Sequence, residues 1–174
     1  MTNYLENLSI GSTVEVGDMK RRIHYYGDGI IKTPKEVVHK TKIAFVAAGS
    51  GITPFYRIIK ESLESGESTH FTLIYANRSE DDIIYESELN ELHALYPHKF
   101  TYKQVITSPK NIENMKNVHI GHITKDLLQK YLPPPSDDVY IDKMGPQRMR
   151  DSFDDIINQL GYDRQTMIRQ KPKI

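Results

Sequence analysis

The sequence contains no cysteine, and its charges cancel, with 23 Lys and Arg residues against 23 Asp and Glu residues. The lack of cysteine excludes disulfide bonds, catalysis by a thiolate and iron–sulfur clusters held by cysteine. A net charge of zero gives no indication of a nucleic-acid partner or of binding to an anionic membrane surface. We therefore expect neither partner for this chain.

Long apolar runs are missing as well. No stretch approaches the roughly 20 apolar residues that a membrane-spanning helix needs. The first residues, MTNYLENLSIGSTVEV, are polar and acidic where a secretory signal has an apolar core. We expect a soluble intracellular chain, cytoplasmic or mitochondrial, without direct membrane insertion. Its 174 residues leave room for one ordinary domain with a short appendage.

Residues 41–61 combine the signals of a strand, a glycine turn and a helix. Residues 43–48 are almost wholly apolar, as in a parallel strand covered on both faces. Residues 49–51, GSG, turn the chain where side chains would block the turn or an approaching ligand. Free N–H groups and the dipole of the following helix suit a phosphate there. Many α/β units carry such a turn for tight packing alone, so this signal by itself leaves both interpretations open.

The helix after the turn has its own start and stop signals. Thr53 is a good N-cap, and Pro54 is a good first helical residue because its missing N–H would be unpaired there. Apolar residues follow at helical spacing, and Gly66 ends the helix. The residues assigned to this predicted phosphate site are Gly49, Ser50, Gly51, Thr53 and Pro54.

From residue 35 onward, strand-like and helix-like segments alternate. This order indicates βαβ units and therefore an α/β fold with a doubly wound, largely parallel five-stranded sheet, in which residues 43–48 are central. The predicted strands are residues 43–48, 71–76, 101–106, 139–142 and, with a weaker signal, 166–169. The predicted helices are residues 54–65, 85–96, 125–132 and 147–160.

The sequence GSGITP at residues 49–54 is not the G-x-G-x-x-G fingerprint of dinucleotide-binding proteins. It resembles instead the G-x-G-I-T-P motif of the ferredoxin reductase superfamily. Within that superfamily, the closest resemblance is to the family of NADH–cytochrome b5 reductase and nitrate reductase. Residues 76–84, ANRSEDDII, closely resemble that family's A-N-R/Q-S/T-E-x-D-I-L segment. The resemblance covers nearly the whole chain and implies an NAD-binding domain of the ferredoxin reductase type.

This resemblance assigns the segment that begins at Ala76 to the adenosine half of NADH. The acid at Asp82 favours NADH in the family, because a carboxylate repels a 2′-phosphate and can accept hydrogen bonds from ribose hydroxyls. Acidic residues at this position also suit the N-terminus of a following helix, which is the alternative explanation for them. The residues assigned to this part of the site are Ala76, Asn77, Arg78 and Asp82.

Residues 139–149, VYIDKMGPQRM, correspond to V-L-x-C-G-P-P-x-M in the family, where the cysteine lies beside the nicotinamide and flavin rings. Met144 replaces that cysteine, and Asp142 and Lys143 replace apolar strand residues, although buried charges need a partner or solvent. These departures gather on the flavin-facing side and bear on hydride transfer more than on nucleotide binding. The residues assigned to this part of the site are Met144, Gly145, Pro146 and Met149.

The N-terminal residues have a different pattern. A helical turn at residues 4–8, strands at residues 13–16 and 23–26, and a Gly27-Asp28-Gly29 turn are predicted. Residues 1–15 resemble the last segment of the family's flavin domain, whose R-x-Y-S/T motif has no counterpart here. The resemblance therefore divides the chain into residues 1–34, a remnant of the FAD-binding barrel, and residues 35–174, the NAD(P)-binding domain.

Two main functions follow from the resemblance, and a third, a nucleotide-sensing module that binds NADH without chemistry, lies between them. The chain is either the NADH-binding domain of a cytochrome b5 reductase-like oxidoreductase, or a catalytically silent accessory subunit of a larger complex, such as a mitochondrial respiratory assembly. In the first case, hydride passes to FAD only when a flavin domain is supplied elsewhere, so we expect no catalytic residue and no activity in the isolated chain. In either case, a protein partner is expected to cover the side left open by the missing barrel.

His119 and His122 lack a third ligand nearby and predict a surface loop rather than a metal site.

Overall fold

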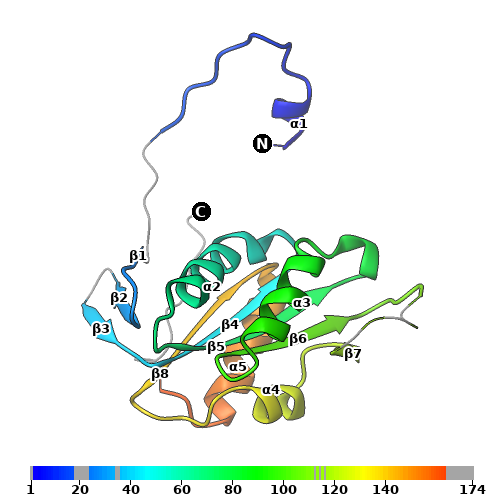
Figure 1. Cartoon of the computed structure of the whole chain (residues 1–174). Helices are drawn as coiled ribbons and strands as arrows, with labels where there is room; N and C mark the ends of the chain where they lie inside the picture. Colours follow the sequence, from blue (N-terminus) through cyan, green and yellow to red (C-terminus); the bar gives the residue numbers. More distant parts are fainter. Residues whose placement is uncertain are drawn as a thin grey trace.

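The structure, a computed structural model, describes residues 2–17, 24–33, 36–111, 113, 115 and 117–163. Within these residues, the chain forms a five-stranded parallel sheet with helices on both faces and a separate three-stranded antiparallel sheet (Figure 1). The predicted α/β class with a doubly wound parallel sheet is confirmed.

The parallel sheet has the order β7-β6-β5-β4-β8. The chain runs outward from β4 through β5 and β6 to β7, and then returns to place β8 on the other side of β4. The strand order therefore reverses at β4, and ligands of such sheets bind beyond the carboxyl ends of the strands at the reversal. The strands are β4 (Lys42–Ala48), β5 (His70–Asn77), β6 (Phe100–Ile106), β7 (Val118–Ile120) and β8 (Val139–Met144).

Strand β7 was not predicted, because three residues are too short for a periodic signal. The predicted strand at residues 166–169 lies outside the described residues. Strand β8 continues two residues past its predicted end, through Lys143 and Met144.

The four predicted helices are present, with bounds within one residue of prediction. They are α2 (Thr53–Ser65), α3 (Glu86–Leu95), α4 (Lys125–Tyr131) and α5 (Gln147–Gln159). Helices α2 and α3 cover one face of the parallel sheet, and α4 and α5 cover the other (Figure 1). None of the described helices has both the length and the apolar character needed to cross a bilayer.

The residues of β4 alternate between the two faces. Phe45 enters the cluster under α2 and α3, where its ring stacks on that of Phe55 with centroids 4.2 Å apart. Ala44 and Val46 enter the cluster under α4 and α5. Both faces of β4 are thus covered, which accounts for its almost wholly apolar sequence.

Strand β8 buries two charged residues side by side. The side chain of Lys143 faces α5, where its ammonium forms an ion pair with Asp154 and donates to the Arg150 carbonyl at 3.1 Å. Asp142 is 3% exposed, and its Oδ1 accepts a 2.7 Å hydrogen bond from the Lys143 amide. Burial raises the pKa of Asp142 to about 7. A buried charge needs a partner, and Lys143 has a charged one in Asp154. The hydrogen bond to Asp142 comes instead from the neighbouring backbone amide of Lys143.

The N-terminal residues differ in part from the prediction. Helix α1 (Thr2–Glu6) supplies the predicted helical turn, but residues 13–16 form no strand. Their alternating pattern was misleading, because a strand needs a neighbour and none of the described residues pairs with them.

The predicted strand at residues 23–26 and the turn that follows it are both present, although the strand is shorter than predicted. Strands β1 (His24–Tyr25), β2 (Ile30–Lys32) and β3 (Val37–His39) form the antiparallel sheet, with β1 and β2 joined through the predicted turn. All three turn residues have positive φ, including Asp28 at 44°. This sheet spans residues 24–39, so it includes residues on both sides of the predicted domain boundary at residue 34. The division of the chain into two domains at that boundary remains a prediction.

Tyr25 holds the β1–β2 hairpin against the larger domain. Its hydroxyl donates to Glu67, and it accepts hydrogen bonds of 3.0 Å from the Gly29 amide and from the Ser62 hydroxyl of α2. The Tyr25 ring meets the edge of Phe71 on β5, with centroids 6.2 Å apart. The hairpin is thus packed as part of the domain.

Candidate nucleotide-binding site

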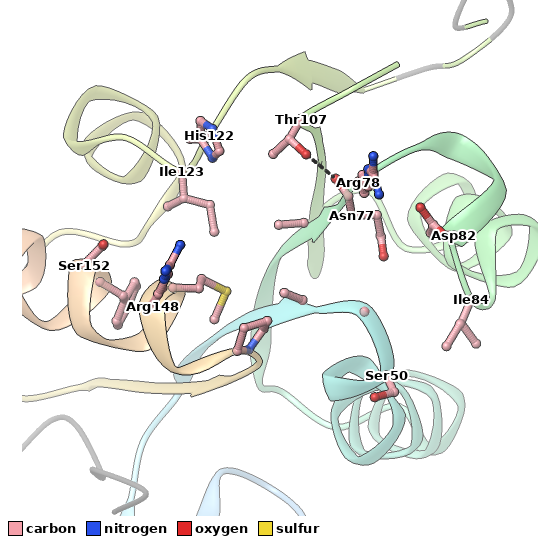
Figure 2. Close-up of a pocket in the computed structure, with 16 residues that line it drawn as sticks. Ser50, Asn77, Arg78, Asp82, Ile84, Thr107, His122, Ile123, Arg148 and Ser152 are labelled. Carbon is pink, nitrogen blue, oxygen red and sulfur yellow. Dashed lines mark hydrogen bonds between the residues drawn. The ribbon is translucent and has the colours of Figure 1, made fainter. Parts of the chain in front are cut away.

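A cavity of about 680 Å³ opens at the carboxyl ends of the central strands of the parallel sheet (Figure 2). It lies at the strand-order reversal, and its walls come from segments far apart in sequence. Eight of the thirteen predicted site residues line it, namely Gly49, Ser50, Ala76, Asn77, Arg78, Asp82, Pro146 and Met149. The other five, which are Gly51, Thr53, Pro54, Met144 and Gly145, lie in the same segments but are not among its lining residues.

The glycine turn is a 3-10 helix, η1 (Gly49–Ile52), which follows β4 directly. Gly49 has φ +53°, a left-handed conformation that favours glycine. Gly51 is needed for a different reason, because a Cβ there would lie 2.4 Å from the carbonyl oxygen of Met144. The packing explanation therefore holds for Gly51, while Gly49 and Ser50 face the cavity.

The prediction that Thr53 is an N-cap is wrong. Because η1 leads straight into α2, Thr53 is already helical, with φ −54° and ψ −46°. Its hydroxyl donates to the Ser50 carbonyl at 3.1 Å instead of accepting from the first turn of α2. Pro54 lies in the first turn of α2, one residue after the start of the helix rather than at the predicted first position. The run of helical residues therefore begins at η1 rather than after Thr53.

The segment after β5 is held by a capping box. In this box, Oδ2 of Asp82 accepts hydrogen bonds from the Ser79 hydroxyl at 2.7 Å and from the Ser79 amide at 3.0 Å, closing the short helix η2 (Glu80–Asp82). The bonds from Ser79 hold the pKa of Asp82 below its usual range. In the orientation that satisfies its neighbours, the Asn77 amide donates to the Asp82 carbonyl at 3.2 Å. Asp82 therefore presents an ionised, exposed carboxylate to the cavity at neutral pH.

Glu80 connects this segment to the chain beyond β6. Its carboxylate accepts hydrogen bonds from the backbone amides of Lys110 and Asn111. The bond from the Lys110 amide is the main cause of a lowered pKa at Glu80. The Lys110 ammonium also pairs with Asp81 at 2.6 Å. Two of the three acids of η2 thus serve the loop, which leaves Asp82 as the acid that lines the cavity.

The connection from β8 to α5 passes close to β4. A Cβ on Gly145 would lie 3.0 Å from the Cβ of Ala48 and 2.9 Å from Cε of Met149. Pro146 directly precedes α5 and lines the cavity together with Met149. The small residue at position 145 therefore lets the third predicted segment reach the same cavity as the glycine turn.

A parallel sheet with this glycine turn, capped acidic segment and Gly-Pro connection corresponds to one known family. Residues 45–155 match the family model described as the oxidoreductase NAD-binding domain. The chain belongs to this family.

Two curated relatives agree with this assignment. The chain is 34% identical over 151 residues to nitrate reductase (NADH) 1 of Zea mays, covering 86% of this chain and 24% of that protein. It is 34% identical over 157 residues to NADH-cytochrome b5 reductase 1 of Homo sapiens, covering 86% of this chain and 50% of that protein. The chain thus spans a quarter to a half of the length of these relatives.

A solved structure gives the same result. The cytochrome b5 reductase domain of Ulva prolifera nitrate reductase superposes with a TM-score of 0.84 at 27% identity, covering 96% of this chain and 64% of that one. The resemblance to the cytochrome b5 reductase and nitrate reductase family is therefore confirmed.

Other residues that line the cavity of this NAD-binding domain were missed by sequence reasoning. Figure 2 shows Arg148 on the wall opposite Asp82, with His122 and Ile123 beside it. His122 is the residue for which a surface loop was predicted; it lies after β7, a strand whose carboxyl end went unrecognised. Within the described residues, no three His, Asp or Glu side chains are grouped to hold a metal ion. The missed lining residues are Ile84, Thr107, His122, Ile123, Arg148 and Ser152, with Ala48 and Phe153.

Proposed function

We propose that this chain binds NADH as the nicotinamide-nucleotide domain of a cytochrome b5 reductase-like oxidoreductase. The observation that carries the proposal is the cavity itself. It joins the glycine turn, the segment around Asp82 and the start of α5, which are the three segments that the family resemblance assigns to NADH. Their convergence at the strand-order reversal is where a parallel sheet binds a nucleotide.

Each wall of the cavity suits a different part of the cofactor. The turn at Gly49 and Ser50 offers backbone N–H groups to a pyrophosphate. Asp82 can accept from ribose hydroxyls, and the cationic side chains of Arg78 and Arg148 add positive charge for the phosphates. Pro146 and Met149 line the wall assigned to the nicotinamide end. In this proposal, the chain binds and orients the cofactor, and bound NADH supplies the hydride.

The acid at position 82 should make NADH bind several-fold more tightly than NADPH, because its carboxylate repels a 2′-phosphate. Asp82→Ala should bring the affinities for NADH and NADPH closer together. Asp82→Asn should reduce the difference between the two affinities equally, while it keeps an oxygen that can accept hydrogen bonds from Ser79 in the capping box. Calorimetric titration of both cofactors provides the measurement. Asp81→Asn is the matched control, because Asp81 pairs with Lys110 and is not a lining residue. Equal affinities of the unmutated chain for the two cofactors would show that this role of Asp82 is wrong.

The isolated chain should not reduce an artificial electron acceptor with NADH, even when FAD is added. Hydride transfer requires the donor and acceptor atoms to be held about 3–3.5 Å apart. Residues 2–17 and 24–33 form one helical turn and part of a small sheet rather than a barrel that could hold FAD in this register. Met144→Cys alone should therefore leave the chain inactive, whereas fusion to a flavin domain should restore some activity. NADH-dependent turnover by the unmodified chain would contradict this expectation.

The alternative function is a silent accessory subunit derived from a reductase. It is favoured by the flavin-facing end of β8, where Asp142, Lys143 and Met144 replace the residues of the family. It is also favoured by exposed apolar side chains around the small sheet, Tyr26 at 61% and Val37 at 62%, which a protein partner could cover. The visible spectrum of the protein purified from its source with its partners separates the two functions. A flavin band supports the oxidoreductase, and its absence supports the accessory subunit.

A further inference from the structure

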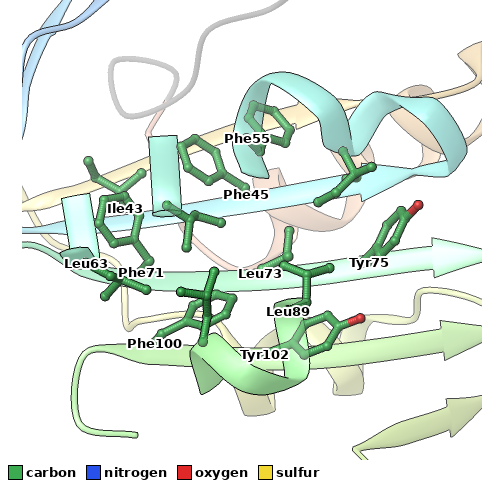
Figure 3. Packing of buried hydrophobic residues seen from close by; sticks show 14 of the residues in the cluster. Ile43, Phe45, Phe55, Leu63, Phe71, Leu73, Tyr75, Leu89, Phe100 and Tyr102 are labelled. Carbon is green, nitrogen blue, oxygen red and sulfur yellow. The ribbon is translucent and has the colours of Figure 1, made fainter. Parts of the chain in front are cut away.

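Tyr75 connects two neighbouring loops that both line the nucleotide cavity. The residue belongs to β5, is 0% exposed, and its ring lies in the core under α2 and α3 (Figure 3). Its hydroxyl donates to the carbonyl oxygen of Gly49 at 3.0 Å and accepts a 3.3 Å hydrogen bond from the amide of Ile84. Gly49 opens the glycine turn η1, and Ile84 closes the segment that contains Asp82.

The bond to Gly49 fixes the orientation of a cavity-lining peptide. The carbonyl of Gly49 and the N–H of Ser50 belong to one planar, trans peptide, so they point in opposite directions. Because the carbonyl points toward the buried Tyr75 hydroxyl, the Ser50 N–H points away from it. Gly49 has a left-handed φ of +53°. Because glycine can adopt many other backbone conformations, a hydrogen bond is needed to hold the peptide in this one.

The bond to Ile84 fixes the other loop. Ile84 lines the cavity, and the next residue, Tyr85, has a left-handed φ of 63°. The ring of Tyr85 stacks on Tyr56 of α2, with centroids 4.0 Å apart and planes 14° apart. The loop is therefore held on one side by this aromatic stack and on the other by the Tyr75 hydroxyl.

A second buried tyrosine shows that this fold does not require a buried hydroxyl to be bonded. Tyr140 on β8 is 2% exposed, and its hydroxyl has no hydrogen-bond partner among the described residues. Its ring lies on the same side of the sheet as that of Tyr75. The bonds of the Tyr75 hydroxyl to Gly49 and Ile84 are thus a feature of its position between the loops.

We propose that Tyr75 is a positioning residue for NADH, which sets the glycine turn and the Asp82 segment at a fixed separation without touching the cofactor. The proposal rests on the proposed function. A ligand that spans both loops uses this separation, whereas a ligand that contacts one loop does not. Loss of the hydroxyl should therefore affect a spanning ligand selectively.

The experiment compares Tyr75→Phe with the matched control Tyr140→Phe, which removes a buried hydroxyl that has no described partner. Calorimetry measures the affinities for NADH and ADP-ribose, which span both loops, and for AMP, which reaches only the adenosine side. We expect Tyr75→Phe to weaken NADH and ADP-ribose about tenfold and to leave AMP within about twofold. Tyr140→Phe should leave all three affinities unchanged. Equal loss for AMP and NADH, or no loss for NADH, would overturn the proposal.

Hydrogen exchange of the ligand-free proteins separates this inference from the proposed function. Tyr75→Phe should speed amide exchange in residues 49–53 and 83–85 together, and Tyr140→Phe should speed it in neither segment. If the unmutated chain does not bind NADH, the proposed function is wrong, and the exchange result alone decides whether Tyr75 couples the loops. Unchanged exchange in either segment would overturn the coupling.

Discussion

Replacing Asp154 by asparagine should destabilise the domain by about 3–5 kcal/mol, because it leaves the buried ammonium of Lys143 without its charge partner. Lys143 is only 2% exposed, and its ammonium also contacts the neutral Arg150 carbonyl and the ring of Phe153, whose centroid lies 5.2 Å from the nitrogen. Since the ion pair joins β8 to α5, part of the nucleotide site should loosen with it. Urea unfolding, followed by circular dichroism, measures the loss.

Two further variants make this expectation specific. Asp151→Asn alters an exposed acid of the same helix, which accepts a hydrogen bond from Gln147, and it should change the free energy of unfolding by no more than about 0.5 kcal/mol. The double change Lys143→Met with Asp154→Leu should recover most of the lost stability, because an apolar pair of similar volume requires no buried charge. A single Asp154→Asn variant as stable as the Asp151→Asn control would contradict the buried ion pair.

Asp142 should make the unmutated domain less stable as the pH rises from about 4 to about 7. Burial raises the folded-state pKa of this carboxyl to about 7, so in this range the folded chain binds a proton that the unfolded chain has released. The contribution of Asp142 to the free energy of unfolding therefore falls with rising pH. It is fully present below the unfolded-state pKa and is lost as the pH passes the folded-state pKa. The difference between this folded-state pKa, which already includes the opposing effect of the Lys143 charge, and the ordinary pKa of Asp corresponds to about 4 kcal/mol at most.

Asp142→Asn tests this pH dependence. Asparagine keeps an oxygen for the Lys143 amide but cannot ionise, so the variant should match the unmutated chain at pH 4 and exceed its stability at pH 8. Urea unfolding of both proteins across this range gives the difference, in which the contributions of the other titrating groups cancel. A difference that stays constant with pH would mean that Asp142 does not titrate in the fold.

The elements that sequence patterns predicted well are those whose pattern is caused by local burial. Strand β4 is apolar because both of its faces are covered, and α2 has Pro54 in its first turn and ends at Gly66, which has a φ of 80°. Residues 13–16 alternate as a half-buried strand would, but none of the described strands pairs with them, so the pattern alone was insufficient there. Strand pairing is a tertiary property that a local pattern does not contain.

The candidate site divides in the same way. The turn at Gly49 and the segment ending at Asp82 are contiguous motifs, so their residues could be identified from the sequence. Arg148 stands at the variable position of the third motif, and His122 was assigned only to a surface loop. Both reach the cavity because β7 and β8 end at the same edge of the sheet. The role of Tyr75 was also hidden, since a tyrosine inside an apolar strand has the same sequence signal whether or not its hydroxyl bonds to a loop.

The central claim is that these segments form an NADH site, and calorimetric titration of the unmutated chain with NADH tests it most directly. We expect saturable binding of one NADH per chain, several-fold tighter than that of NADPH and abolished by prior saturation with ADP-ribose, which would occupy the same cavity. A titration with no saturable heat, confirmed by unchanged thermal stability at millimolar NADH, would contradict the claim.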